Sequence, residues 1–176
     1  MPQKIIALMD GTCPIDKHRL VKWMQQGDLR TRAAVYELTR QAWNRIQPGI
    51  TMEEQGNFMA SYLLECLMTN PQSKDDYLHS GFSAGWELAA WLKHLAGNPE
   101  FKTIIQIVAE RLTTAYLSSD SETRNRIETG ALEHILEMPA LRQFFVSWEK
   151  NQELAEAYRL CLDWGVAHEN AEWNRG

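Results

Sequence analysis

Residues 119–138 read SDSETRNRIETGALEHILEM, and this stretch predicts a long helix with a defined start. Ser119 or Asp120 can cap the first free backbone N–H groups, and Glu122 lies in the first turn, where the helix dipole favours an anion. At about 100° per residue, the apolar side chains gather on one broad face. That face consists of Ile127, Ala131, Leu132, Ile135, Leu136 and Met138. A helix with this pattern packs against other helices, so the stretch indicates a helical fold.

Glu128 interrupts that apolar face. It projects from the middle of the face, and Arg124 lies one turn earlier on the same side. Because a carboxylate among apolar side chains is costly unless it is paired or hydrated, we expect Glu128 to be mostly buried and paired with Arg124. Two interpretations follow. The pair either lines a cleft and holds a ligand or a partner's side chain, or it is an ordinary i,i+4 ion pair with nothing bound.

The rest of the chain predicts further helices joined by short, capped turns. Thr51 and Glu54 fit a capping box, and Pro99 follows the capping residue Asn98 at another helix start. No segment has a convincing strand pattern. We therefore expect an all-α fold, a single compact bundle or short solenoid-like array of about seven to nine helices, with helix over about 60% of residues. Besides 119–138, the expected helices cover about 16–26, 29–46, 51–68, 82–96, 100–117, a segment from Pro139, and 153–168.

The 176 residues suit one domain with a sizeable core. Residues 1–14 lack a helical period and are expected to form an N-terminal arm or loop. A helical domain is expected over 15–170, followed by a frayed tail over 171–176. The apolar run Ile5–Met9 is too short for a signal peptide, and no run of about 18 apolar residues is present. These features predict a cytoplasmic protein that does not bind a membrane.

The composition argues against nucleic acid as a partner. The net charge is −5 and no cluster of Lys and Arg is present, whereas nucleic-acid-binding modules usually carry a basic stripe. An acidic surface suits a basic protein partner, and the sequence indicates no oligomeric state. Cys13, Cys66 and Cys161 occur without a CxxC motif, and an odd number of such cysteines is typical of reduced thiols.

No motif for catalysis or cofactor binding is present. The chain has no G-x-S-x-G nucleophile elbow, no glycine-rich phosphate loop and no Glu-x-x-His pair of the kind that helical di-iron sites use. His134 and Glu137 share a helix face, as do Glu87 and His94, but solvated or hydrogen-bonded side chains explain such pairs more simply than a metal does. We therefore expect no catalytic residue, no cofactor and no metal ligand.

The seven tryptophans are many for a chain of this length, and most lie at helical apolar spacing, which is typical of a core. Trp86 and Trp91 differ because they flank a polar stripe that includes Glu87 and His94. Aromatic side chains beside polar ones are also typical of an interaction surface. The candidate binding residues are Trp86, Glu87, Trp91, His94, Arg124, Glu128 and His134.

The run from Ser118 to His134, S-x-D-x-E-T-R-N-R-I-x-x-G-x-L-E-H, resembles a pattern in small all-helical bacterial domains, several of which are suspected immunity proteins of polymorphic toxin systems. The resemblance covers residues 118–134 alone and assigns a role to no residue. It implies a non-enzymatic bacterial protein-binding domain, such as a toxin-neutralising immunity protein whose partner is a basic toxin domain. The alternative is a small-ligand-binding protein or enzyme with a polar site around Glu128, Arg124 and His134.

Overall fold

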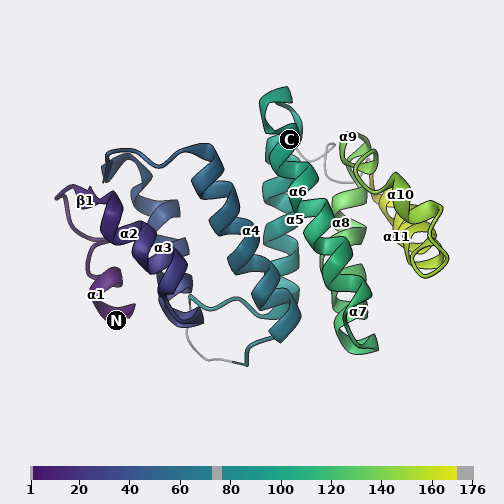
Figure 1. Ribbon diagram of the computed structural model, residues 1–176, viewed down its shortest axis with the longest axis horizontal. Coiled ribbons are helices and arrows are strands. Elements are labelled where there is room, and N and C mark those ends of the chain that lie inside the picture. The colour runs from purple at the N-terminus through teal and green to yellow at the C-terminus, as the bar shows by residue number, and fades with distance from the viewer. Residues whose placement is uncertain (1, 73–76, 170–176) are drawn as a thin grey trace. The chain divides into compact units, whose positions relative to one another are not determined.

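The computed structural model describes residues 2–72 and 77–169 (Figure 1). The chain is 75% helical, which confirms the prediction of an all-α fold. The structure also contains two strands that the sequence did not indicate, β1 (Ile15–Asp16) and β2 (Ile46–Gln47), which pair in parallel. Strands of two residues are too short to show an alternating pattern in the sequence. The expected frayed tail over 171–176 lies outside the described residues.

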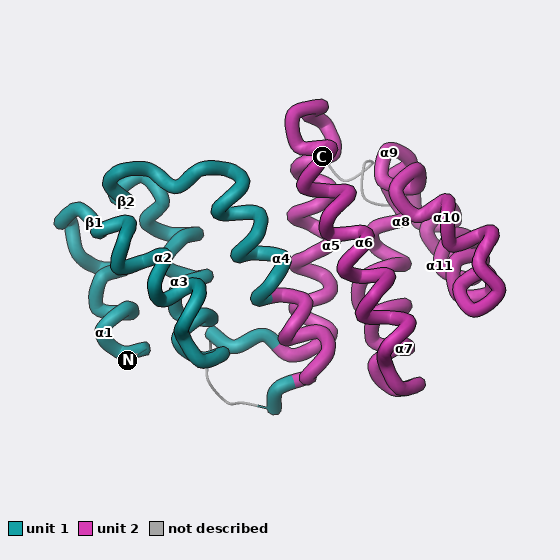
Figure 2. The backbone as a smooth tube through the Cα atoms, viewed as in Figure 1, with its two compact units in different colours: residues 1–62, 71–79 teal, residues 63–70, 80–176 magenta. Residues whose placement is uncertain are grey.

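The chain divides into two compact units (Figure 2). Unit 1 comprises residues 1–62 and 71–79, and unit 2 comprises residues 63–70 and 80–176. The helix α4 (Met52–Thr69) contributes residues to both units. A single domain over residues 15–170 therefore stays a prediction.

Unit 1 contains short helices with side-chain caps. Asp28 accepts a hydrogen bond from the Thr31 N–H at 2.8 Å, and the predicted capping box at Thr51 and Glu54 forms in both directions, at 3.1 and 2.8 Å. The expectation of an arm or loop over 1–14 is wrong over Pro2–Ile6, because the helix α1 forms there and buries Ile5 completely. The remaining elements are α2 (Lys17–Gln26), α3 (Leu29–Ala42) and the 3₁₀ helix η1 (Trp43–Arg45).

Unit 2 is built around the helix that the stretch 119–138 predicts. It is continuous through α7 (Ser121–Ile127), the π-helical turn η3 (Glu128–Leu132) and α8 (Glu133–Leu136), and we call it the central helix. Asp120 caps it by accepting from the Thr123 N–H at 2.8 Å. The predicted apolar face is buried except at Met138, which is half-buried and lies past the end of α8. The other elements of the unit are α5 (Gly81–Ala96), η2 (Pro99–Phe101), α6 (Lys102–Leu117), α9 (Pro139–Arg142), α10 (Val146–Glu149) and α11 (Ala155–His168).

Two glycines let neighbouring helices approach the backbone of the central helix. A Cβ atom on Gly85 of α5 would lie 2.4 Å from the Gly130 carbonyl oxygen, and one on Gly165 of α11 would lie 2.7 Å from the Leu136 carbonyl carbon. Real Cβ atoms essentially never come closer than 3.0 Å to such atoms. In Figure 1, α8 accordingly lies between α5 and α11. Side chains from these three helices therefore meet on the surface of unit 2.

Arg126 joins the central helix to the end of α4 within unit 2. Its side chain is buried and donates hydrogen bonds to the Leu67 and Met68 carbonyl oxygens at 3.2 and 3.0 Å. These carbonyls belong to the last turn of α4, where no further helical N–H groups are available. Arg126 also bonds to the Thr123 hydroxyl and pairs with Glu122 at 2.7 Å. The Arg126 side chain thus caps the C-terminal end of α4, although Arg126 belongs to the central helix.

Among the described residues, no helix is long and apolar enough to cross a membrane.

Candidate functional site

The π-helical turn changes which side chains of the central helix share a side. The Glu133 N–H bonds to the Glu128 carbonyl oxygen, five residues earlier. An i→i+5 turn brings residues five apart to the same side of the helix, whereas an α-helix does not. Glu133 therefore lies on the same side of the central helix as Glu128. Glu137 lies on that side as well, one α-helical turn after Glu133. Because turns of this kind occur frequently at functional sites, the side chains around this one form the candidate site.

Glu133 is a half-buried carboxylate that forms no hydrogen bond or ion pair with any described residue. Burial raises the pKa of this carboxyl, His134 opposes that rise, and the nearby carboxylate of Glu128 adds to it. The surroundings therefore compensate the charged form only in part for its lost hydration. A cation supplied from outside the chain would compensate it.

A row of four aromatic rings includes His134 and His168, the two histidines that act on the Glu133 carboxyl. The Trp86 ring on α5 meets the His134 ring of α8 edge to face, with centroids 6.2 Å apart. The His134 ring in turn meets Trp164 of α11 edge to face at 4.9 Å, and His168 stacks on Trp164 at 3.9 Å. We call these four side chains the aromatic ladder. Trp86 is 55% exposed, so the ladder ends at the protein surface.

Two charged side chains hold His134 in place. Its Nδ1 atom lies 2.9 Å from Glu137 Oε1, and the Lys93 ammonium donates to the other oxygen of the same carboxylate. The Glu137 side chain is almost completely buried, so the ion pair is shielded from water. The pairing of His134 with Glu137 also explains the histidine and glutamate that share this helix face in the sequence. Trp86 therefore packs against a ring whose orientation is fixed.

The structure brings together only part of the predicted site. Trp86 and His134 are in contact through their rings. Trp91 and Glu87 are half-buried and His94 is exposed, and within the described residues no ring contact joins Trp91 or His94 to the ladder. The surface role of Glu87, Trp91 and His94 stays a prediction.

The prediction that Glu128 pairs with Arg124 is wrong. Glu128 is half-buried, and its Oε1 atom accepts a hydrogen bond from the Tyr116 hydroxyl at 2.5 Å. Arg124 instead donates to the carbonyl oxygens of Tyr116 and Leu117 at 3.0 and 3.1 Å and lies over the Tyr116 ring. Those carbonyls are at the C-terminal end of α6, where the regular helical donors end, so they attract the guanidinium. Both predicted partners therefore contact Tyr116 instead of each other.

Several residues of this site were not identified from the sequence. Trp164 and His168 lie one helical turn apart, which is a detectable signal for a ring pair on one helix face. Glu133 could not be found in this way, because its placement depends on the π-helical turn. Lys93 and Glu137 come from different helices, and their pairing depends on how α5 packs against α8.

Comparison of the chain with known protein families, curated protein sequences and solved structures found no significant match.

In the described part of the chain, no group of three or more His, Cys, Asp and Glu side chains is placed to hold a metal ion. Cys66 and Cys161 are buried and Cys13 is exposed, and none of the three forms a disulfide among the described residues. Burial raises the pKa of the Cys161 thiol, which disfavours the reactive thiolate.

Proposed function

We propose that this chain is a non-enzymatic, cytoplasmic protein-binding domain that binds a basic protein through the aromatic ladder and Glu133. The specific form of the proposal is a bacterial immunity protein that neutralises a toxin, and the resemblance over residues 118–134 supports that form. The observation that carries the proposal is the exposed Trp86 ring, which packs on His134, the residue next to the half-buried carboxylate of Glu133.

Trp86 has the properties of an interface anchor. Tryptophan is enriched among the few residues that supply most of the binding energy at protein interfaces. Here the indole ring is more than half exposed and packs against the fixed imidazole of His134. A side chain that is already ordered loses little conformational entropy when a partner covers it. The ladder therefore offers a preorganised contact to a partner.

The charge of the site indicates a basic partner. The histidines near Glu133 offset only part of the cost of its partial burial, and a lysine or arginine from a partner would offset more of it. The net charge of the whole chain, −5, would attract such a partner over a longer range. Glu133 and the net charge thus favour the same class of partner, a protein with exposed lysine or arginine.

Site-specific crosslinking inside the native host tests the binding proposal. A photo-crosslinking amino acid at position 86 should capture a specific basic protein. The same amino acid at Ile107, an exposed apolar position on α6 of the same unit, should not capture it. Equal capture at both positions, or none at position 86, would contradict the proposal.

The captured protein then tests the immunity form of the proposal. Expression of the captured protein alone should stop bacterial growth, and co-expression of this chain should restore it. A captured protein that does not affect growth would exclude the immunity form, while the binding surface would still stand on the crosslink.

A further inference from the structure

A second feature of unit 2 lies away from the aromatic ladder and shares no residue with it. The C-terminal end of α5, the turn η2, the start of α6 and the helix α9 enclose an open pocket of about 240 Å³, which we call the α6–α9 pocket. It is slightly smaller than the roughly 300–1,000 Å³ of pockets that hold drug-sized ligands. The α6–α9 pocket therefore suits a molecule the size of a single substituted ring.

One side of the pocket is apolar. Ile105 of α6 is buried, and Phe144, which follows α9, is half-buried. Ala96 and Ala140 add small side chains to the same lining. Apolar surface of this kind favours the hydrocarbon part of a ligand, because burial removes both surfaces from water.

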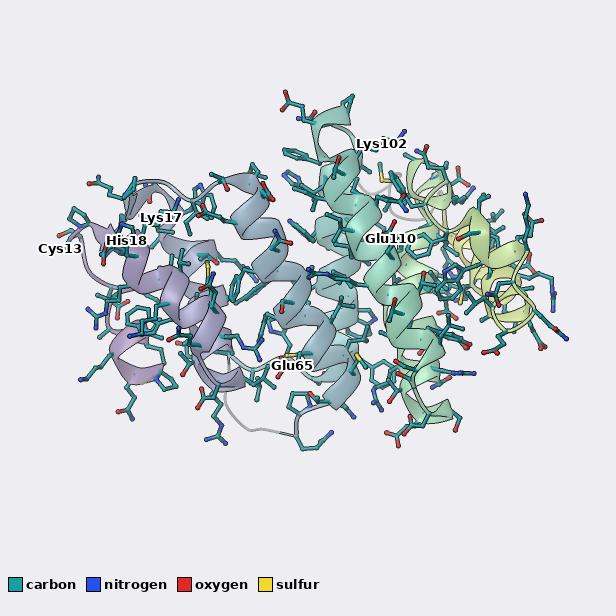
Figure 3. The ribbon with its side chains drawn as sticks, viewed as in Figure 1. Cys13, Lys17, His18, Glu65, Lys102 and Glu110 are labelled. Atoms are coloured by element: carbon teal, nitrogen blue, oxygen red, sulfur yellow. The ribbon has the colours of Figure 1, made fainter. Side chains whose placement is uncertain are left out.

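The polar side chains of the lining include hydrogen-bond donors. Lys102 forms no hydrogen bond or ion pair with any described residue, and its ammonium has three donors. The Asn98 side chain accepts from the Glu100 N–H through its oxygen at 3.0 Å, which leaves its amide N–H groups to donate. Gln143 donates to the Ala140 carbonyl oxygen at 2.8 Å. Figure 3 labels Lys102 in the upper part of the view, close to where Figure 1 labels α9.

We propose that the α6–α9 pocket binds small amphipathic carboxylates. The apolar body of the ligand would lie against Phe144 and Ile105, and its carboxylate would accept hydrogen bonds from Lys102 and Asn98. A carboxylate has two acceptor oxygens and no donor, so it matches a lining with one cation and a free amide donor. The glutamate at position 100 is exposed and does not line the pocket, but its charge opposes an anion.

Three probes of similar size and different charge test the ligand class. Benzoate, benzyl alcohol and benzylamine are titrated into the full chain while backbone amide shifts are recorded by NMR. Benzoate should give saturable shifts at Asn98, Lys102 and Gln143, with a Kd on the order of 1–10 mM, as expected for so few heavy atoms. Benzylamine should bind at least about tenfold more weakly, because its cation meets Lys102. Benzoate without saturable shifts, or equal binding of the anion and the cation, would overturn the proposal.

Variants separate the charge of the pocket from its shape. Lys102→Gln should weaken benzoate binding about tenfold or more, and Glu100→Gln should strengthen it. Lys150→Gln changes an exposed lysine outside the pocket and should leave the affinity for benzoate unchanged.

Gly97 offers a test of shape, because it lines the pocket and a Cβ atom there would meet nothing within 4 Å. Gly97→Leu should reduce the binding of benzoate and of benzyl alcohol alike, while the remaining amide spectrum stays that of the folded chain. Unchanged benzoate binding by Lys102→Gln would show that the lysine does not hold the carboxylate, and the proposal would fail.

Discussion

At the scale of single residues, ionisation of Glu133 costs more in the folded chain than in the unfolded one. Its native pKa is raised, chiefly by burial, above the ordinary glutamate value of about 4.3. The folded state therefore binds the proton more tightly than the unfolded chain, and stability falls as pH rises through the interval between the two pKa values. Below that interval the carboxyl is protonated in both states and costs nothing.

Glu133→Gln should therefore stabilise the protein at pH 7, and the gain should disappear as pH falls to about 4. Urea unfolding of the variant and the natural chain at both pH values measures the difference. Glu153→Gln, at an exposed carboxylate, serves as the control and should change stability at neither pH. A loss of stability in Glu133→Gln at pH 7 would show that an internal partner compensates the carboxylate.

Tyr116 gives a second dependence on pH, in the alkaline range. Burial and the hydrogen bond to Glu128 raise the pKa of its hydroxyl. Above about pH 10, the ordinary tyrosine pKa, the folded chain keeps a proton that the unfolded chain has lost, so stability falls by up to about 1.4 kcal/mol per pH unit. Tyr116→Phe lacks this proton, and its stability should fall less steeply between pH 10 and 11. Parallel stability curves for the two proteins would contradict the assignment.

The difference between the predicted and observed partners of Glu128 shows what a sequence can reveal about single residues. The helical period places Arg124 and Glu128 on one side of a helix, and that part of the prediction is sound. It does not reveal that Tyr116 and the carbonyls at the end of α6 lie within reach of both. Competition among partners from different helices is decided by packing, which spacing along one helix does not describe.

At the scale of helices and turns, the sequence was most informative about helix starts. Thr51, Asn98 and Asp120 each cap a helix as the sequence predicts, because a cap depends on residues within one turn. The π-helical turn at Glu128–Leu132 gave no such signal. It coincides with the close approach of α5 at Gly130, and an approach between two helices is not encoded in a local pattern.

Gly85 is expected to be indispensable to the packing of α5 on the central helix. A Cβ atom at this position would lie 2.4 Å from a backbone oxygen, which cannot move without shifting the helix. Gly85→Ala should therefore lower the free energy of unfolding by about 3 kcal/mol or more. Gly97→Ala is the matched control at the end of the same helix, where a Cβ atom meets nothing within 4 Å, and it should stay within about 0.5 kcal/mol. Similar stability of the two variants in urea melts would refute the close approach.

The attachment of the α4 end to the central helix is expected to depend on Arg126. Arg126→Met removes the donors for two carbonyls and leaves them without compensation, so it should cost at least about 2 kcal/mol. Arg159→Met provides a comparison, since the exposed Arg159 makes only a 3.6 Å pair with Asp163 and should cost less than about 0.5 kcal/mol. Chemical unfolding measures both. A cost for Arg126→Met as small as that of the control would mean that water replaces the guanidinium.

At the scale of the whole molecule, composition and helical period were sufficient to predict the fold class. Capped segments with one apolar face covered most of the chain, and the structure is 75% helical. The candidate site was less accessible, since Trp86, His134 and Trp164 come from three helices that meet only after folding. The sequence identified Trp86 and His134 separately, by their polar surroundings, but it could not show that their rings touch.

The central claim is that the aromatic ladder is a binding surface, and the affinity of Trp86→Ala for the captured partner tests it most directly. Because the indole is 55% exposed, the variant should keep its melting temperature. Its affinity should fall about thirtyfold or more, which corresponds to about 2 kcal/mol, as expected for an interface anchor. Ile107→Ala should bind as the natural chain does. Trp86→Ala with unchanged affinity, or with affinity lost only because the protein unfolds, would contradict the account.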